Sequence, residues 1–250
     1  MIRNDEKMTW NDHPIPALRA APNEPLPGRL LKLRNRHGKI WLNVGGGNFF
    51  MDDFVNVDSN VLCLLAPFYP AIKPVLKAPA REWLDTYKAR RLPHNFVFAN
   101  CRFSLKFPAN SVDHILISHF LEHLHYEDAV SVLANYFSIL RPGGTLHIIV
   151  PDLAQTARIY LDAFGDPAAT EAFVDWLGFR KRRMTRLLVR MLQVTGWFEI
   201  GHCYVYDVPL LSKLARNAGF DIRPCNDSPS ASWRLKDPWQ VNMLFQKPVP

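Results

Sequence analysis

The sequence predicts an α/β fold built on an open, mostly parallel sheet with helices on both faces. Short apolar segments alternate along the chain with segments of helical periodicity, as strands and crossover helices do in such sheets. The first apolar segment runs directly into three glycines, and an acidic residue ends the second. Because ligands bind beyond the carboxyl ends of the strands in open α/β sheets, this turn is the first candidate site.

Six segments have the composition of strands. They are IWLNV (40–44), FVNVD (54–58), NFVFAN (95–100), VDHILIS (112–118), TLHIIVPD (145–152) and VNMLFQK (241–247). The first is apolar almost throughout and stops at glycine, which is typical of a parallel strand buried on both faces. These segments account for most of the expected sheet.

Helical spacing defines the elements between the strands. The predicted helices are PAREWLDTYKAR (79–90), YEDAVSVLANYFSIL (126–140), LAQTARIYLDAF (153–164) and DVPLLSKLARNAGF (207–220). RPGG ends the second helix, and Gly219 suits the C-terminal stop of the last. GRLLKLRNRHGK (28–39) has the pattern of a short basic helix that leads into the domain.

Composition favours one large domain. The chain has 250 residues, of which 48% are hydrophobic, enough for a sizeable core. We expect residues 29–250 to form this domain, with a basic helical insertion around 165–200, and the Pro- and Asn-rich residues 1–28 to form a poorly ordered arm.

The N-terminus has no apolar signal segment, and the 4 cysteines show no CxxC spacing. These features favour reduced thiols in a cytoplasmic protein.

A net charge of +7 favours anionic partners. Much of it lies in FRKRRMTRLLVRML (179–192), where apolar residues share one helical face and arginines cover the rest. Such a helix suits peripheral contact with an anionic membrane, or an anionic acceptor. A solvated basic face that covers the site is the alternative. No recognised module supports nucleic-acid binding.

The glycine turn predicts a nucleoside site. Gly45, Gly46 and Gly47 let a ligand approach the backbone, and Asp58 can accept hydrogen bonds from both hydroxyls of a ribose. The dinucleotide fingerprint fits badly, because Phe50 stands where its third glycine belongs. The connection from Gly47 to the second strand is also too short for a phosphate-binding helix. A plain tight turn is the alternative.

Three further stretches extend the pattern. LNVGGGNFFMDDFVNVD, FANCRFSLKFPANSVDHILISHFLEHL and ILRPGGTLHIIVPDL together resemble the consecutive motifs of class I S-adenosylmethionine-dependent methyltransferases. GHCYVYDVPLLSKLARNAGF resembles a late segment of the type 11-like branch, which is often linked to cell-surface polysaccharide biosynthesis. The resemblance implies a seven-stranded Rossmann-like sheet with S-adenosylmethionine as cofactor. It also implies a small-molecule or glycan acceptor, with O-methylation the expected reaction.

The resemblance also implies residue roles. The expected cofactor-binding residues are Gly45, Gly46, Gly47, Asn48, Asp58, Ser59, Asn100, Cys101, Ser118 and His119. Among them Asn100 and Cys101 would contact adenine, and Ser118 and His119 would face the reacting methyl. Two acids of the usual pattern are replaced, by Asn43 before the glycines and by Asn100. These replacements leave open a non-catalytic protein that binds the cofactor or serves as a scaffold.

Two histidines are the candidate catalytic bases. A hydroxyl acceptor needs a group that takes its proton, and His119 and His202 are the candidates. HFLEH (119–123) also matches H-x-x-E-H, a zinc-protease signature that would need His119 and His123 one helical turn apart. Because the motif follows a strand that the methyltransferase pattern explains, zinc hydrolysis is the weaker alternative and no metal ligand is assigned. The aromatic run WFEIGHCYVYD (197–207) fits an acceptor pocket or a core strand equally well.

Overall fold

The computed structural model describes most of the predicted domain. The described residues are 33–47, 49–59, 62, 66–89, 96–177, 201–230 and 239–250. The predicted arm (1–28) and basic helix (179–192) lie outside these ranges, as do Asn48 and Trp197. Of the expected basic helix at 28–39, the described part forms turns instead. No helix within the described ranges is both long enough and apolar enough to cross a membrane.

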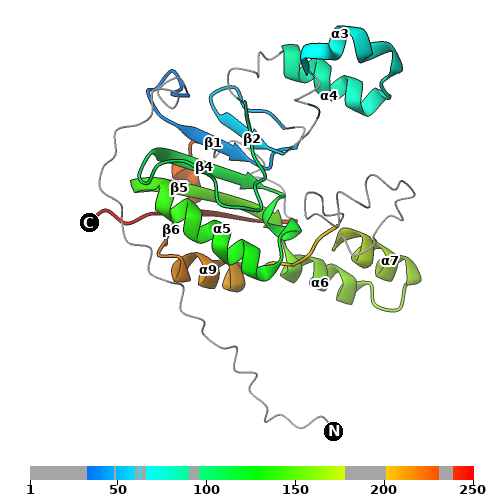
Figure 1. The fold of residues 1–250 in the computed structure, drawn as a ribbon. Coiled ribbons are helices and arrows are strands. Elements are labelled where there is room, and N and C mark those ends of the chain that lie inside the picture. Colours follow the sequence, from blue (N-terminus) through cyan, green and yellow to red (C-terminus); the bar gives the residue numbers. More distant parts are fainter. Residues whose placement is uncertain are drawn as a thin grey trace.

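Within the described residues, seven strands form one sheet in the order β3-β2-β1-β4-β5-β7-β6 (Figure 1). Their bounds are β1 Trp41–Val44, β2 Val55–Asp58, β3 Phe96–Phe98, β4 Val112–Ser118, β5 Leu140–Pro151, β6 Asp221–Arg223 and β7 Gln240–Gln246. The strands from β3 to β5 pair in parallel, whereas β7 runs antiparallel to both β5 and β6. The predicted seven-stranded, mostly parallel Rossmann-like sheet is confirmed.

The helices follow the predicted alternation. They are α3 Tyr69–Ile72, α4 Ala78–Ala89, α5 Tyr126–Ile139, α6 Leu153–Asp162, α7 Pro167–Trp176 and α9 Val208–Asn217, with short 3-10 helices η1 Ala66–Phe68, η2 Lys73–Val75, η4 Leu121–His123 and η5 Cys225–Asp227. Aspartate side chains cap α6, α7 and α9 by accepting backbone N–H bonds. Gly219 adopts φ of 101° two residues after α9 ends, as a helix stop does.

Two strand predictions need correction. The helix α5 does end before RPGG, at Ile139, but β5 begins at Leu140 and not at residue 145, so RPGG is the first part of the strand. The register of its pairing with β4 shifts between Val112 and His114, which accommodates this irregular start. β6 was not predicted, because it has only three residues, all exposed, and no apolar alternation marks it.

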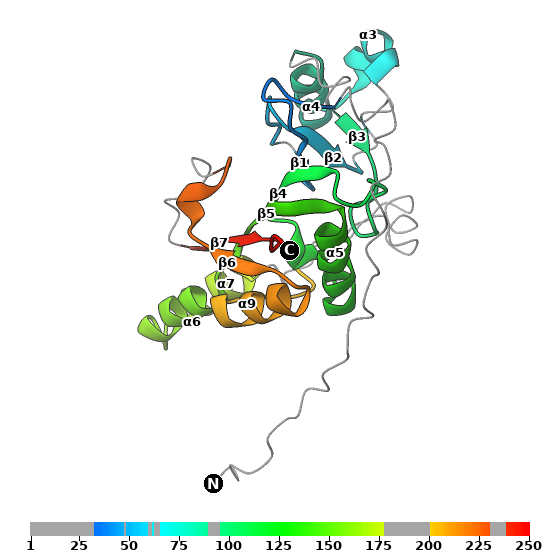
Figure 2. The same ribbon diagram turned by 90° about the vertical axis from the view of Figure 1, so that its left-hand side faces the viewer.

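The main core lies between the sheet and two helices. Figures 1 and 2 show α5 and α9 on the same side of the sheet. Alternate strand residues such as Leu42, Ile117 and Ile148 are fully buried there together with Tyr136 of α5 and Leu211 of α9. This period-two alternation is what directs the opposite residues, including Asn43 of β1, to the second face of the sheet.

On the second face, β1 connects to β2 through a short segment without a helix, and two buried amide side chains hydrogen-bond to its backbone. Asn43 Nδ2 donates to Asn56 Oδ1 (2.9 Å) and to the Phe49 carbonyl (2.7 Å). Asn56 Oδ1 also accepts from the Met51 N–H (3.0 Å), and its Nδ2 donates to the carbonyls of Met51 and Phe54 (3.2 and 3.3 Å). Backbone groups that a helix would satisfy internally are therefore satisfied by these side chains. The predicted short crossover is confirmed.

Another part of the second face holds a buried polar network. His147 Nδ1 lies 2.6 Å from Ser230 Oγ, and its Nε2 lies 2.5 Å from Asn242 Oδ1. Burial lowers the pKa of His147, and it lowers the pKa of His114 on the neighbouring strand to about 3. Both rings therefore stay neutral near pH 7 and serve as hydrogen-bonding groups that hold residues 228–230 against the sheet.

Replacing Asn56 with leucine is expected to destabilise the fold. The change removes the acceptor of Asn43 and of Met51 and leaves buried polar groups unpaired, at a cost of about 2–3 kcal/mol in the free energy of unfolding. Urea unfolding at equilibrium measures this cost. Asn217→Leu, at an exposed position that ends α9, is the control. Equal stability of the two variants would contradict the role assigned to the amide pair.

Candidate functional site

The glycine turn opens at the carboxyl end of β1. Gly45 and Gly47 adopt φ of 67° and 58°, in the left-handed region that glycine occupies readily. A Cβ on Gly45 would lie 2.4 Å from the Phe120 ring, whereas a Cβ on Gly47 would have no atom within 4 Å. The indole of Trp83 in α4 donates to the Gly47 carbonyl at 3.2 Å. The backbone at Gly47 is therefore held in place and faces open space.

Gly46 has a different role from its neighbours. A Cβ there would lie 2.6 Å from Asn43 Nδ2 and 2.7 Å from the Phe49 carbonyl. Gly46 thus faces the amide pair that closes the short crossover, and it does not line the cavity described below. A larger side chain at this position disturbs the turn itself, not the space that a ligand occupies.

Asp58 ends β2 beside the glycines. Its Oδ2 accepts from the Gly47 N–H at 2.8 Å, which orients the carboxylate toward the turn. An ionised carboxylate accepts up to about four hydrogen bonds. The bond from Gly47 is therefore compatible with the predicted acceptance from ribose hydroxyls.

Asn100 and Cys101 follow β3, the strand that neighbours β2 on the side away from β1. Asn100 Oδ1 accepts from the Arg102 N–H at 3.1 Å, while its buried Nδ2 has no hydrogen-bond partner in the described part of the chain. The amide nitrogen is thus the atom left to donate to a ligand. Burial, with a smaller contribution from the Asp58 carboxylate, raises the pKa of the Cys101 thiol. Cys101 is therefore a protonated packing residue and not a nucleophile.

These residues enclose a cavity of about 300 Å³. It is lined by Gly45, Gly47, Asp58, Ser59, Asn100, Cys101, Arg102, His119, Phe120, His123 and Leu124. Seven of the ten residues predicted to bind the cofactor are among them. Gly46 and Ser118 are not, and Asn48 lies outside the described residues. Phe120, Arg102, His123 and Leu124 were not predicted to line it, although the position of Phe120 directly after His119 could have suggested it.

His119 stands where β4 ends and has an unusual backbone. Its φ is 53°, a conformation that few non-glycine residues adopt. Its Nδ1 lies 3.2 Å from Glu122 Oε1, and its Nε2 lies 2.8 Å from the amide nitrogen of Gln240. Because the amide nitrogen donates, Nε2 accepts, and the ring proton sits on Nδ1 facing the carboxylate. This is how a carboxylate orients a histidine base.

A second cavity of about 350 Å³ adjoins the first at His119. Its walls are His119, Pro151, Trp176, His202, Trp239 and Gln240. His119 lines both cavities, so the two predicted catalytic histidines face one space. Of the described part of the aromatic run, residues 201–207, only His202 lines this cavity. Tyr206 is fully buried in the core, where Tyr204 packs against it at 5.5 Å between ring centroids.

The loop after β4 and the segment before α9 are joined at Glu122. Its carbonyl accepts from the N–H groups of Cys203 and Tyr204 at 2.8 and 3.1 Å. His123 Nδ1 lies 3.0 Å from the Gly201 carbonyl. Burial lowers the pKa of His202, an effect that the Glu122 carboxylate opposes. The backbone contacts fix His202 beside Glu122 and His123, although some 80 residues separate them in sequence.

The zinc-protease geometry does not form. His119 precedes the 3-10 helix η4 with a left-handed φ, so His119 and His123 are not on successive turns of an α-helix. HFLEH therefore lacks the structural context that its signature requires.

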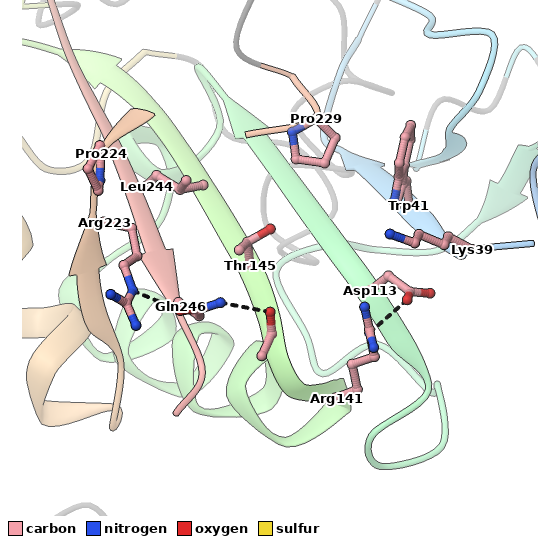
Figure 3. Close-up of a pocket in the computed structure, with 11 residues that line it drawn as sticks. Lys39, Trp41, Asp113, Arg141, Thr145, Arg223, Pro224, Pro229, Leu244 and Gln246 are labelled. Atoms are coloured by element: carbon pink, nitrogen blue, oxygen red, sulfur yellow. Dashed lines mark hydrogen bonds and ion pairs between the residues drawn. The ribbon is translucent and has the colours of Figure 1, made fainter. Parts of the chain in front are cut away.

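A further cavity, of about 530 Å³, lies at the amino ends of β1, β4 and β5 (Figure 3). Both arginines that line it are engaged by neighbours: Arg141 pairs with Asp113 at 2.7 Å, and Arg223 donates to Gln246 at 2.7 Å. It is on the opposite edge of the sheet from the glycine turn, and none of the predicted site residues lines it.

Comparisons with known proteins gave one family match and several similar structures. A family model described as a methyltransferase domain matches residues 15–224. A search of curated proteins gave no match. Among solved structures, a Methanosarcina mazei S-adenosylmethionine-dependent methyltransferase aligns with a TM-score of 0.47 and 18% identity, covering 84% of this chain and 92% of that one.

Two Burkholderia thailandensis structures are also similar. An O-methyltransferase family protein aligns with a TM-score of 0.46 and 13% identity over 84% of this chain, which spans about half (51%) of that protein. A 1,6-didemethyltoxoflavin N1-methyltransferase with bound S-adenosylhomocysteine gives 0.42 and 19%, covering 86% of this chain and 75% of that one.

Asp58→Ala is expected to weaken the binding of S-adenosylhomocysteine about ten- to hundredfold, because a hydrogen bond to a charged group contributes about 1.5–3 kcal/mol. Calorimetric titration measures the affinity, and the exposed Asp221→Ala in β6 is the control for a lost surface charge. If Asp58→Ala binds as tightly as the wild type, the nucleoside lies elsewhere.

Proposed function

The chain belongs to the methyltransferase-domain family, and on that premise we propose that it transfers the methyl group of S-adenosylmethionine to a hydroxyl group. The acceptor is a small molecule or glycan held in the cavity of Trp176, His202 and Trp239. The observation that carries this proposal is that His119 lines both cavities. A group transferred from one cavity to the other passes beside this one side chain.

The first cavity has the groups that the cofactor needs. The backbone at Gly47 faces open space that a side chain would fill. Asp58, which already accepts from the Gly47 N–H, would accept from the ribose hydroxyls. The buried Asn100 Nδ2, which lacks a partner in the described part of the chain, would donate to a ring nitrogen of adenine. The amides that replace the usual acids are therefore compatible with cofactor binding.

The reaction requires alignment and the removal of one proton. The acceptor oxygen forms the new C–O bond while the C–S bond breaks, and the sulfur keeps the electron pair of that bond. The chain's own contribution is to align the two reactants and exclude water. His119 takes the acceptor proton on Nε2, since Nδ1 is protonated toward Glu122. Gln240, which donates to Nε2 in this structure, must give way to the acceptor hydroxyl.

The walls of the second cavity favour a ring-shaped acceptor. Trp176 and Trp239 line this cavity, and indole rings suit sugars and other flat or ring-shaped groups. The net charge of +7 further favours an anionic acceptor. Peripheral membrane contact through residues 179–192 is a separate proposal that concerns residues outside the described ranges.

The acceptor class can be tested with labelled cofactor. The full chain is incubated with methyl-labelled S-adenosylmethionine and a panel of glycans and small alcohols, each paired with an amine analogue of the same ring. Label in an ether linkage on the hydroxyl compounds supports the proposal. Label on the amines alone, or cofactor binding without transfer to any compound, contradicts it.

His119→Asn is expected to slow single-turnover methyl transfer about 10²–10⁴-fold, the contribution of a positioned base. Asparagine tolerates the left-handed backbone of this position but cannot take the proton. The affinity for S-adenosylhomocysteine should stay close to that of the wild type. His37→Asn, at an exposed histidine, is the control. A wild-type rate in His119→Asn would exclude His119 as the base.

Trp239→Ala is expected to raise KM for the acceptor about two- to tenfold, since a ring contact contributes about 0.5–1.5 kcal/mol. Steady-state kinetics measure KM, and S-adenosylhomocysteine affinity should not change. Phe68→Ala removes an aromatic ring of η1 that is 65% exposed and serves as the control. An effect on cofactor affinity with an unchanged KM would contradict the assignment of the second cavity to the acceptor.

A further inference from the structure

Three potential metal ligands converge where the two cavities meet. Glu122, His123 and His202 each offer one ligand atom, and these atoms all lie within 4.8 Å of one another. His123 lines the cofactor cavity, whereas His202 lines the acceptor cavity. The cluster therefore lies between the two predicted binding sites.

Glu122 has a buried carboxylate oxygen that a bound cation would compensate. Its side chain is 1% exposed. Oε1 is held by His119, but the buried Oε2 has no hydrogen-bond partner among the described residues. An ionised carboxylate in such a position is costly unless a charge or a metal compensates it. The carboxylate thus has one oxygen engaged by a ring N–H and one left to coordinate.

The two histidines are arranged as metal ligands usually are. His123 Nδ1 donates to the Gly201 carbonyl at 3.0 Å, which places the proton on Nδ1 and leaves the Nε2 lone pair to coordinate. Such a bond from the second ring nitrogen to a backbone carbonyl orients most metal-binding histidines. The buried Nδ1 of His202 has no partner in the described part of the chain. The rings lie 5.1 Å apart at 70°.

We propose that Glu122, His123 and His202 bind one divalent transition-metal ion, of which Zn²⁺ is the representative. Two imidazole nitrogens and one carboxylate oxygen are the ligand set that such ions prefer, and three protein ligands leave a position open. Ligand atoms around tetrahedral zinc lie about 3.4 Å apart, given bonds of about 2.0–2.1 Å. The three atoms lie within 4.8 Å of one another, and they must close to this spacing when the ion binds.

The ion's role in the reaction rests on the proposed function, whereas its binding does not. At the open position the ion holds the acceptor oxygen between the cavities and lowers the pKa of the hydroxyl, as bound metal does for water. His119 then takes the proton, and the oxygen forms the bond to the methyl carbon. Glu122 links the two groups, with Oε1 on His119 and Oε2 on the ion.

Metal binding is tested on the full chain after chelator treatment and desalting. Calorimetric titration with ZnCl₂ should give one ion per chain, and titration with CoCl₂ should give the visible absorption bands of cobalt bound by nitrogen and oxygen. Glu122→Gln and His202→Asn should each lower the Zn²⁺ affinity at least about tenfold, because even outer partners of metal ligands contribute about 10–100-fold.

His125→Asn is the matched control, because His125 is exposed and lies two residues from His123 but outside the cluster. It should bind Zn²⁺ like the wild type. Circular dichroism checks that each variant is folded, and His202→Asn decides the result if Glu122→Gln unfolds. Absence of a stoichiometric Zn²⁺ site in the wild type, or equal affinity in the folded ligand variants, overturns the proposal.

Titration with S-adenosylhomocysteine in the same samples separates this inference from the proposed function. One bound Zn²⁺ that depends on the cluster supports the metal site, even if no acceptor is methylated. Methyl transfer at the same rate with and without chelator, in a chain that binds no Zn²⁺, overturns the metal site and leaves the proposed function standing.

Discussion

The hydrogen bond between Asn43 and Asn56 is the contact on which the cofactor side of the structure depends. It joins β1 to β2 beneath the glycine turn. The connection between the two strands is therefore a short segment instead of a crossover helix. Because the turn is short, Gly46 faces inward against the amides while Gly47 faces the cavity. The same constraint brings Asp58 within 2.8 Å of the Gly47 N–H. An aspartate in place of Asn43 would lose the donor that closes this loop.

Glu122 has the corresponding role beside the second cavity, which Trp176 and His202 line. Its backbone carbonyl fixes residues 203 and 204, and its carboxylate fixes the ring of His119. One buried residue thus sets the relative positions of the loop after β4 and the segment before α9. The two halves of the site are built on different elements, but His119 is common to both cavities.

The sequence predicted the seven-stranded architecture well, and it named seven residues that line one cavity at the glycine turn, because strand alternation, glycines and strand-end acids act locally. It did not predict the start of β5 at Leu140, since RPGG has turn chemistry that the sheet overrides. It also missed β6, which is too short to show a pattern. The meeting of Glu122 and His123 with His202 depends on a contact between segments distant in sequence, which no local spacing reveals. The orientation of Gly46 depends likewise on its contact with Asn43.

The position of β7 has a consequence for how the sheet assembles. Although β7 follows β6 in sequence, it lies between β5 and β6. Within the described residues β6 pairs only with β7, so it joins the sheet through the pairing of β7 with β5. Until then, β5 presents an open edge of backbone donors and acceptors that can pair with another chain. Completion of this fold is therefore a late, non-local event, and the edge of β5 is where self-association of folding intermediates would begin.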